Sequence, residues 1–222
     1  VFIAVLLLSF CVNAAEPNRN IIARGSYANS QLQFEKKKTG RVAFMGGSIT
    51  QMNGYRPMVG NWLAKRFPKT KFEFVNAGIS STCSTTGAFR LQSEVLAKGR
   101  IDLFFIEFAV NDDQDAGHQS RECVRGMEGL IRQARKAQPN VDIVVTHFVN
   151  PGMLEQLRSG KMPLPMKAHE KVLKAYNVST IFLSREVADR IEVGKLTWQV
   201  FGGTHPKPAG NAIAAGMIGQ LL

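Results

Sequence analysis

The apolar positions of the chain fall into two kinds of segment, and these predict strands and helices in alternation. Short runs rich in apolar residues predict strands, because a strand covered on both faces has little contact with water. We expect strands at 41–46, 71–75, 101–110, 141–148 and 178–183. Longer segments with apolar residues three and four positions apart predict helices that bury one face. We expect these at 54–67, 87–97, 119–138, 167–176, 185–193 and 208–221, with connections at 151–165 and 196–204.

This alternation predicts an α/β fold, since a helix between two strands returns the chain to the same end of a parallel sheet. Right-handed crossovers then place helices on both faces, which gives a three-layer α/β/α sandwich with a five-stranded parallel sheet. The polar segment 16–40 has no clear period. We expect it to pack as an N-terminal extension on a domain spanning 41–222.

The first residues form an unbroken apolar run over 1–10 that is too short to cross a membrane. Small residues follow, and they fit a cleavage site near Ala14 or Ala15. We interpret 1–15 as a signal peptide that lacks its basic start, with a buried first strand as the alternative. The signal peptide predicts a secreted or periplasmic protein.

Composition indicates one globular domain with a sizeable core, because 45% of the 222 residues are hydrophobic and 20% are charged. The formal net charge is +11, but 36–38 is the only tight basic cluster and no nucleic-acid motif accompanies it. We therefore expect a solvated basic surface, no nucleic-acid partner and no stable membrane insertion. Attraction to an acidic polysaccharide or a membrane surface is the unspecific alternative. The sequence leaves the oligomeric state open.

Two cysteines lie beyond the predicted signal peptide, and both follow predicted strands. In an oxidising compartment Cys83 and Cys123 could form a disulfide. Two free thiols are the alternative, and the sequence does not decide between them.

Candidate chemistry begins at Gly46-Gly47-Ser48, where an apolar strand ends in two glycines and a serine. The glycines permit a sharp turn that leaves the hydroxyl uncrowded. Ser48 would then lie just past the carboxyl end of a strand, where open α/β sheets bind their ligands. Ser48 is a candidate nucleophile, and a simple helix N-cap is the alternative.

Other polar residues are expected at the same edge. A loop of small residues, 78–82, follows the second strand, Asn111 follows the third, and His205 precedes the last helix. An ester-cleaving site needs these parts: a hydroxyl, a histidine that accepts its proton, and donors that stabilise the oxyanion. The pattern predicts such a site.

These residues are arranged as in the SGNH (GDSL-type) hydrolase superfamily, which the chain resembles. The matching blocks run in the family order, 46–50, 76–81, 109–112 and 205–206, and span almost all of 41–222. The resemblance implies a flavodoxin-like fold and a serine esterase or lipase that uses no metal or organic cofactor. By position it implies Ser48 as nucleophile and His205 as general base. It also implies an oxyanion hole made by the Ser48 N–H, a backbone N–H from Ser81 or, second, Gly78, and the Asn111 amide.

The chain departs from the family pattern at three positions. Gly47 replaces the usual aspartate of the first block, which is not part of the chemistry, and Ser81 stands where the family has its oxyanion glycine. The third departure is Gly202, which occupies the position of the acid three residues before the histidine. A substitute would have to come from another loop. The candidates are Asp112, Glu107, Asp113 and Asp115, although Glu107 also suits a purely structural hydrogen bond or ion pair inside the domain. A Ser–His dyad oriented by a backbone carbonyl or water is the other option.

The remaining histidines have weaker claims. His118 suits a surface loop, His147 ends the fourth strand, and His169 suits a structural position on a helix. Their spacing does not predict a metal site.

The sequence therefore predicts a secreted serine ester hydrolase with a small-molecule or glycan ester as substrate. We expect a carbohydrate esterase that removes acetyl or other short acyl groups, because the domain is compact and has neither a long lid nor an obvious apolar channel. The first alternative is a lipid-type esterase, meaning a lysophospholipase or thioesterase. The second is a catalytically impaired domain of the same fold that binds glycans, which the glycine at 202 keeps open.

Overall fold

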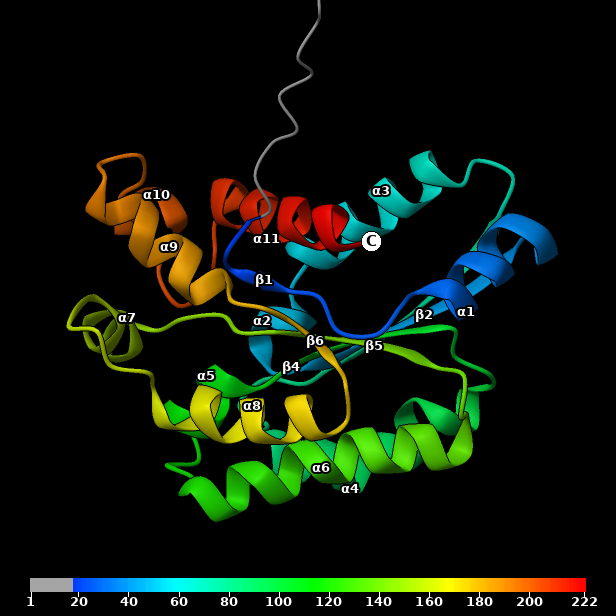
Figure 1. The fold of residues 1–222 in the computed structure, drawn as a ribbon, viewed down its shortest axis with the longest axis horizontal. Helices are drawn as coiled ribbons and strands as arrows, with labels where there is room; N and C mark the ends of the chain where they lie inside the picture. Colours follow the sequence, from blue (N-terminus) through cyan, green and yellow to red (C-terminus); the bar gives the residue numbers. More distant parts are fainter. Residues whose placement is uncertain (1–17) are drawn as a thin grey trace, which may run out of the picture.

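A single sheet organises the protein, and its carboxyl edge carries the predicted chemistry. The computed structural model describes residues 18–222 (Figure 1). The strand order is β1-β6-β5-β4-β2-β3. Five strands run parallel, which confirms the predicted fold class: β2 (Thr39–Gly46), β3 (Lys71–Gly78), β4 (Leu103–Glu107), β5 (Asp142–Thr146) and β6 (Ser179–Ile181). The predicted signal peptide, 1–15, lies outside the described residues.

The sheet has one strand more than the sequence predicts. The additional strand β1 (Ile21–Ile22) pairs antiparallel with β6 and forms one edge of the sheet. Its register places Ile21 opposite Ile181 and Ile22 opposite Thr180. Two residues are too few to show an apolar period, so only the pairing identifies this strand.

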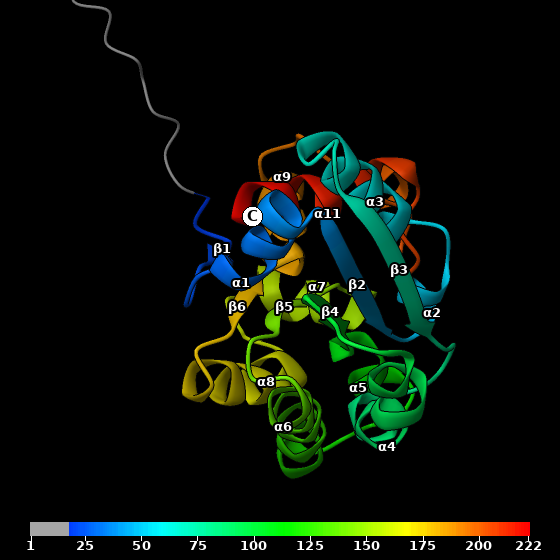
Figure 2. The same cartoon turned by 90° about the vertical axis from the view of Figure 1, so that its right-hand side faces the viewer.

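Two layers of helices cover the two faces of the sheet (Figure 2). One layer contains α3 (Tyr55–Arg66), α9 (Leu183–Glu192) and α11 (Pro208–Leu221); the other contains α4 (Ser84–Glu94), α6 (Ser120–Ala137) and α8 (Leu164–Ala175). Side chains of β2 alternate between the layers: Val42 and Phe44 join the first core, and Ala43 and Met45 join the second. This is the period of two expected for a strand that is buried on both faces.

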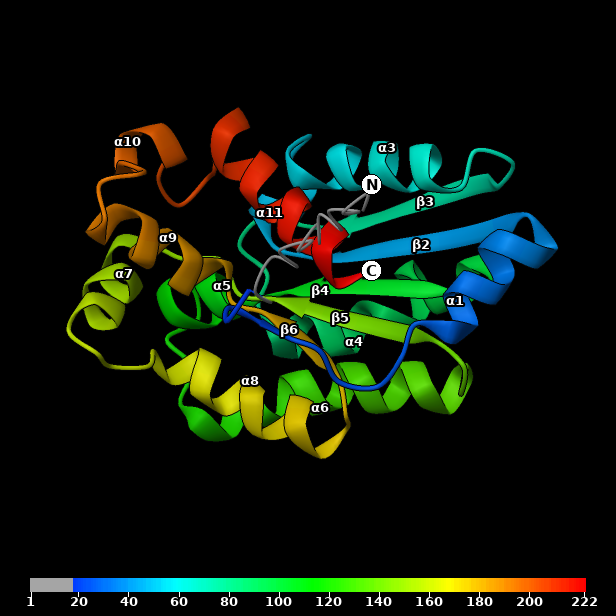
Figure 3. The ribbon, with the colours of Figure 1, turned by 45° about the horizontal axis from the view of Figure 1, so that its top comes forward.

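Short helices lie beside or between the layers. Near the N-terminus, α1 (Ala28–Leu32) continues into a π-helical turn at Gln33–Lys37, and a 3₁₀ turn at Leu96–Lys98 follows α4. The others follow strands or precede α11: α2 (Ser48–Gln51), α5 (Ala109–Gln114), α7 (Pro151–Arg158) and α10 (Trp198–Phe201). Figure 3 shows α5, α7 and α10 at the same end of the sheet.

Several boundaries differ from the sequence prediction. The predicted connection 196–204, for example, contains α10. The strand predicted at 101–110 ends at Glu107, and Ala109 and Val110 belong to α5 although they are fully buried. A buried strand and a buried helix are both apolar, so the sequence pattern could not show where the strand ends and the helix begins. The predicted connection 151–165 contains α7, which begins where the Asn150 side chain accepts a hydrogen bond from the Met153 N–H, 2.8 Å away.

The parallel register brings three strand ends to one level. Gly46 of β2 lies opposite Gly78 of β3 and Glu107 of β4. Behind them the Phe44 and Phe105 rings stack at 4.9 Å between centroids. The segments that follow these strands must therefore meet at one edge, which is where Ser48 and Asn111 lie.

Two further observations concern the sequence predictions. Across residues 18–222, no helix is both long enough and apolar enough to cross a membrane. Among residues 18–222, Cys83 and Cys123 are free thiols, the first half-buried and the second buried.

Candidate active site

The structure brings Ser48 and His205 together across 157 positions of sequence. Ser48 is the first residue of α2, and His205 lies in the loop between α10 and α11. The Ser48 Oγ and the His205 Nε2 are 2.8 Å apart, which is hydrogen-bond distance. Ser48 is half-buried and His205 is exposed. An imidazole nitrogen in this position can accept the proton of the hydroxyl.

A buried polar chain lies beneath the turn that carries Ser48. The Thr50 hydroxyl donates to Glu107 Oε2 over 3.0 Å and lies 3.1 Å from the Tyr55 hydroxyl. All three side chains are at most 1% exposed. A Cβ on Gly46 would lie 2.7 Å from Glu107 Oε2, so the glycine leaves room for the carboxyl group. Glu107 therefore supports the turn that carries Ser48 from inside the protein.

Burial raises the pKa of Glu107 to about 7, because desolvation disfavours the charged carboxylate. Hydrogen bonds from Thr50 and the Gly47 amide oppose this shift, and the negative charges of Asp112 and Asp115 add to it. One carboxyl oxygen, Oε1, has no hydrogen-bond partner among residues 18–222. Burial therefore favours the neutral carboxylic acid of Glu107 more than in an exposed glutamate.

Asn111 lies against the same turn. It is in the first turn of α5, is 2% exposed, and donates from Nδ2 to Asp115 Oδ2 over 2.8 Å. A Cβ on Gly47 would lie 2.1 Å from Asn111 Oδ1. The absence of a side chain at position 47 therefore allows the Asn111 amide to reach the turn that carries Ser48.

The second block forms a tight turn beside α2. The Thr82 N–H donates to the Ile79 carbonyl over 3.3 Å, and Ser81 has a φ of 55°. This left-handed conformation favours glycine, which is the residue that the family places here. The Gly78 N–H donates to Asn76 Oδ1, whereas the Ser81 N–H has no acceptor within residues 18–222. Of the two candidate donors, only Ser81 therefore has an N–H that is free within the described part of the chain.

The loop before His205 is built around a glycine at 202. Gly202 has a φ of 108°, and a Cβ there would lie 2.2 Å from the Lys207 backbone nitrogen. That nitrogen donates to the Phe201 carbonyl over 2.9 Å, so it cannot easily move aside. This loop conformation excludes an aspartate at the family position.

The structure does not bring a substitute acid to His205. Within the described chain, no carboxylate oxygen lies within 4.0 Å of the His205 ring nitrogens. Of the predicted candidates, Glu107 bonds Thr50, Asp113 accepts from Asn150, and Asp115 accepts from Asn111. The pairing of Glu107 or Asp112 with His205 is not found, because each carboxylate has other partners.

Asp112 instead connects three helices. Its two oxygens accept from the Ser84 N–H and hydroxyl, each over 2.7 Å, and from His169 Nε2 over 2.8 Å. Asp112 and His169 are both 0% exposed. These bonds, which outweigh the cost of burial, lower the pKa of Asp112. The start of α4 is thereby joined to α5 and α8, directly behind Asn111.

Two groups of side chains around Asp112 could hold a metal ion. They are Cys83, Asp112 and His118, and Asp112, Cys123 and His169, with the donor atoms of each group within 4.8 Å of one another. Histidine spacing in the sequence does not reveal either group, because each of the five donors lies in a different helix or loop. The hydrogen bonds that Asp112 already accepts account for this arrangement without a metal.

Sequence reasoning missed two residues that support the site, Thr50 and Asn211. Asn211 is 5% exposed, and its Nδ2 donates to the carbonyl of Pro206 over 2.6 Å and to that of Lys207 over 3.0 Å. The available signal was a polar residue among the apolar positions of the helix predicted at 208–221.

The protein is thus a three-layer α/β/α domain with a hydrogen-bonded Ser–His pair at the carboxyl edge of its parallel sheet. The sequence comparison gives the family: residues 44–213 match the model of the GDSL-like lipase/acylhydrolase family. The chain belongs to this family, whose name denotes hydrolysis of ester bonds. No curated protein matches the chain.

Solved structures agree with this assignment. A two-domain esterase active on acetylated mannans is 26% identical, with a TM-score of 0.74, over 89% of this chain and 53% of its own. An acetyl xylan esterase from Geobacillus stearothermophilus is 18% identical, with a TM-score of 0.62, over 82% of this chain and 94% of its own. A lipase/acylhydrolase from Enterococcus faecalis is 17% identical, with a TM-score of 0.63, over 82% and 94%. The last two show the fold alone, and this chain spans about half the length of the mannan esterase.

Proposed function

We propose that the protein is a serine ester hydrolase in which Ser48 is the nucleophile and His205 the general base. The observation that carries this proposal is the 2.8 Å contact between Ser48 Oγ and His205 Nε2. A hydroxyl is a weak nucleophile until a base takes its proton, and a neutral imidazole does so near pH 7.

In this mechanism, Ser48 Oγ attacks the ester carbonyl carbon while its proton moves to His205 Nε2. The tetrahedral intermediate collapses, the bond to the alcohol breaks, and the alcohol leaves with the proton from His205. Water then attacks the acyl-enzyme, His205 takes its proton, and the acid is released as Ser48 is reprotonated. The Ser48 N–H, the Ser81 N–H and the second Nδ2 hydrogen of Asn111 are the donors we assign to the oxyanion.

We propose a glycan ester as substrate, with acetyl or another short acyl group removed. Support comes from the neighbour that is 26% identical to this chain and acts on acetylated mannans. The exposed His205 and half-buried Ser48 form an open site that a polymer can approach. The signal peptide predicted at 1–15 would direct export, which would bring the enzyme to such a polymer.

The decisive experiment is labelling of the purified protein with a fluorophosphonate, together with acetate release from acetylated mannan and acetylated xylan. We expect labelling and acetate release by the wild type and neither by Ser48→Ala. Ser93→Ala is the matched control, since Ser93 is an exposed serine on α4. Labelling that persists in Ser48→Ala would refute the assigned nucleophile.

Chain-length preference separates the lipid-type alternative from the proposal. We expect p-nitrophenyl acetate to be cleaved faster than p-nitrophenyl esters of long acyl chains. The opposite order would indicate a lysophospholipase or thioesterase.

A catalytically impaired, glycan-binding domain is the second candidate function, and the missing acid beside His205 favours it. In a serine protease triad, loss of the correct acid costs about ten-thousand-fold in rate. Binding of acetylated mannan without labelling or acetate release would identify this function.

A further inference from the structure

The position of His205 needs an explanation other than a carboxylate. In a Ser–His–Asp triad, the carboxylate orients the imidazole by bonding the ring nitrogen that does not face the serine. Here Gly202 excludes an acid at the usual place, and no other carboxylate in the described chain reaches the ring. Nevertheless, Nε2 lies at hydrogen-bond distance from Ser48 Oγ.

The backbone on both sides of His205 is tied down. On the N-terminal side, the left-handed Gly202 turns the chain so that the Lys207 N–H closes on the Phe201 carbonyl. On the C-terminal side, Asn211 Nδ2 donates to two consecutive carbonyls, those of Pro206 and Lys207. A histidine has only two side-chain torsions, so a rigid backbone leaves its ring few positions.

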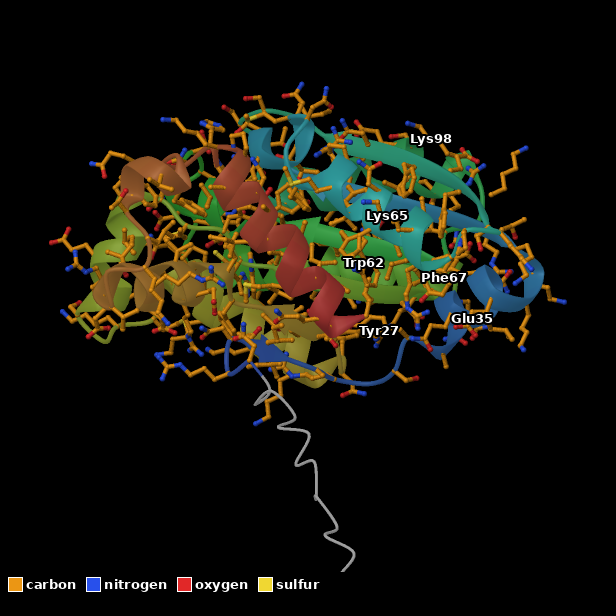
Figure 4. The ribbon with its side chains drawn as sticks, turned by 90° about the horizontal axis from the view of Figure 1, so that it is seen from above. Tyr27, Glu35, Trp62, Lys65, Phe67 and Lys98 are labelled. Carbon is orange, nitrogen blue, oxygen red and sulfur yellow. The ribbon has the colours of Figure 1, made fainter. Side chains whose placement is uncertain are left out.

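The position of Asn211 is fixed by the packing of its own helix, α11, on α3 and by the close approach of Gly54. It lies in the first turns of α11, which packs against α3, and Figure 4 shows Trp62 of α3 beside α11. A Cβ on Gly219 would lie 2.9 Å from Trp62 Nε1, which shows how closely the two helices approach. At the other end of α3, a Cβ on Gly54 would lie 2.4 Å from Asn211 Oδ1. Gly54 belongs to the short segment that connects α2, which begins with Ser48, to α3.

We propose that Asn211 is a positioning residue for His205: its amide clamps the two carbonyls that follow the histidine and holds the ring against Ser48. The proposal rests on the catalytic roles given above. Asn211 touches both the segment after the nucleophile helix and the histidine loop, so it sets the distance between them. Asn211 thereby orients the His205 ring, which is one of the two roles of the acid in a triad. Unlike a carboxylate, it supplies no charge to stabilise the imidazolium.

The test compares Asn211→Ala with the wild type. We expect kcat to fall about tenfold to a hundredfold with KM nearly unchanged, since small displacements of a catalytic group have effects of this size. Asn211→Ser is the milder variant, because a serine hydroxyl at this helical position can still donate to the carbonyl four residues earlier, that of Lys207. We expect its kcat to lie between the other two.

The matched control is Asn20→Ala. Asn20 is 3% exposed and donates from Nδ2 to Glu186 and Asp189, beside β1 and α9. We expect this variant to lose thermal stability as Asn211→Ala does but to keep the wild-type kcat. Equal losses of kcat in the two variants would show that Asn211 acts only through general stability, and would overturn the proposal.

A second readout does not depend on catalysis. The ¹⁵N resonance of His205 Nε2 reports whether the ring is bonded to Ser48, and Ser48→Ala provides the reference for the unbonded ring. We expect Asn211→Ala, and to a smaller extent Asn211→Ser, to move this resonance towards the reference. A wild-type resonance in both variants would refute the clamp. If the wild type cleaves no ester but the resonance still depends on Asn211, the proposed function fails and the positioning role stands.

Discussion

The two halves of the predicted catalytic pair are held in place in different ways. The Ser48 turn rests on a buried polar chain of Glu107, Thr50 and Tyr55, each at most 1% exposed. His205 lies in an exposed loop and is held by hydrogen bonds between backbone atoms and from one amide, Asn211. The comparison shows that a side chain can be oriented from the protein interior or through its own backbone. It also predicts that the two halves respond differently to substitution and to pH.

We expect the largest effect on stability from Gly202→Asp, which places the family's acid at its usual position. The side chain would meet the Lys207 nitrogen, and a non-glycine residue would have to keep a φ of 108°. We expect a loss on the order of 3 kcal/mol in the free energy of unfolding, together with lower activity. Urea denaturation and acetate release would measure both.

Gly203→Asp is the control for this substitution. Gly203 also has a positive φ, 84°, but a Cβ there would meet no atom of residues 18–222 within 4 Å. This variant should have the backbone strain without the steric clash, so its free energy of unfolding should fall by less. An increase in kcat in Gly202→Asp would show that the loop can accept an acid at this position. It would contradict the view that His205 is held only through its backbone.

The next effect concerns the Ser48 side and depends on pH. Because the folded protein raises the pKa of Glu107 from 4.5 to about 7, the folded state binds more protons than the unfolded state between these values. Stability therefore falls as the pH rises through this window, by an amount on the order of 3 kcal/mol. In Glu107→Gln we expect this fall to disappear, so the variant gains stability relative to the wild type as the pH rises from 5 to 8.

Denaturation midpoints at several pH values would measure the difference. Glu155→Gln, at an exposed position on α7, reports the general effect of removing one negative charge. A pH dependence in Glu107→Gln that parallels the wild type would show that this carboxyl is not the group responsible.

The smallest effect is expected at Ser81, where serine occupies a position with a φ of 55°. Ser81→Gly should remove the left-handed strain but add freedom to the unfolded chain, for a net gain of up to about 1 kcal/mol. Ser80→Gly is the neighbouring control. Since Ser80 has no positive φ, that variant should only lose stability. Thermal denaturation would distinguish the two, and a loss in both would exclude strain at Ser81.

Local signals in the sequence were sufficient for most of the fold. The runs at 41–46 and 141–148 are apolar because both faces of these strands are covered, and this is visible without the structure. The signal failed where burial does not distinguish helix from strand, as at Ala109 and Val110, and where an element is as short as β1. In these places, hydrogen bonds to distant residues decide the conformation.

For the site, the sequence by itself determined the motif order, the two glycines before Ser48 and the absence of an acid at 202, because each is a property of neighbouring residues. Only the tertiary structure decided that Ser48 and His205 are 2.8 Å apart, that Asp112 and Glu107 have other partners, and that Asn211 anchors the histidine loop. The reason is physical. A carboxylate or an amide bonds whichever partner the packing of helices and strands brings within about 3 Å, and sequence separation carries no information about that distance.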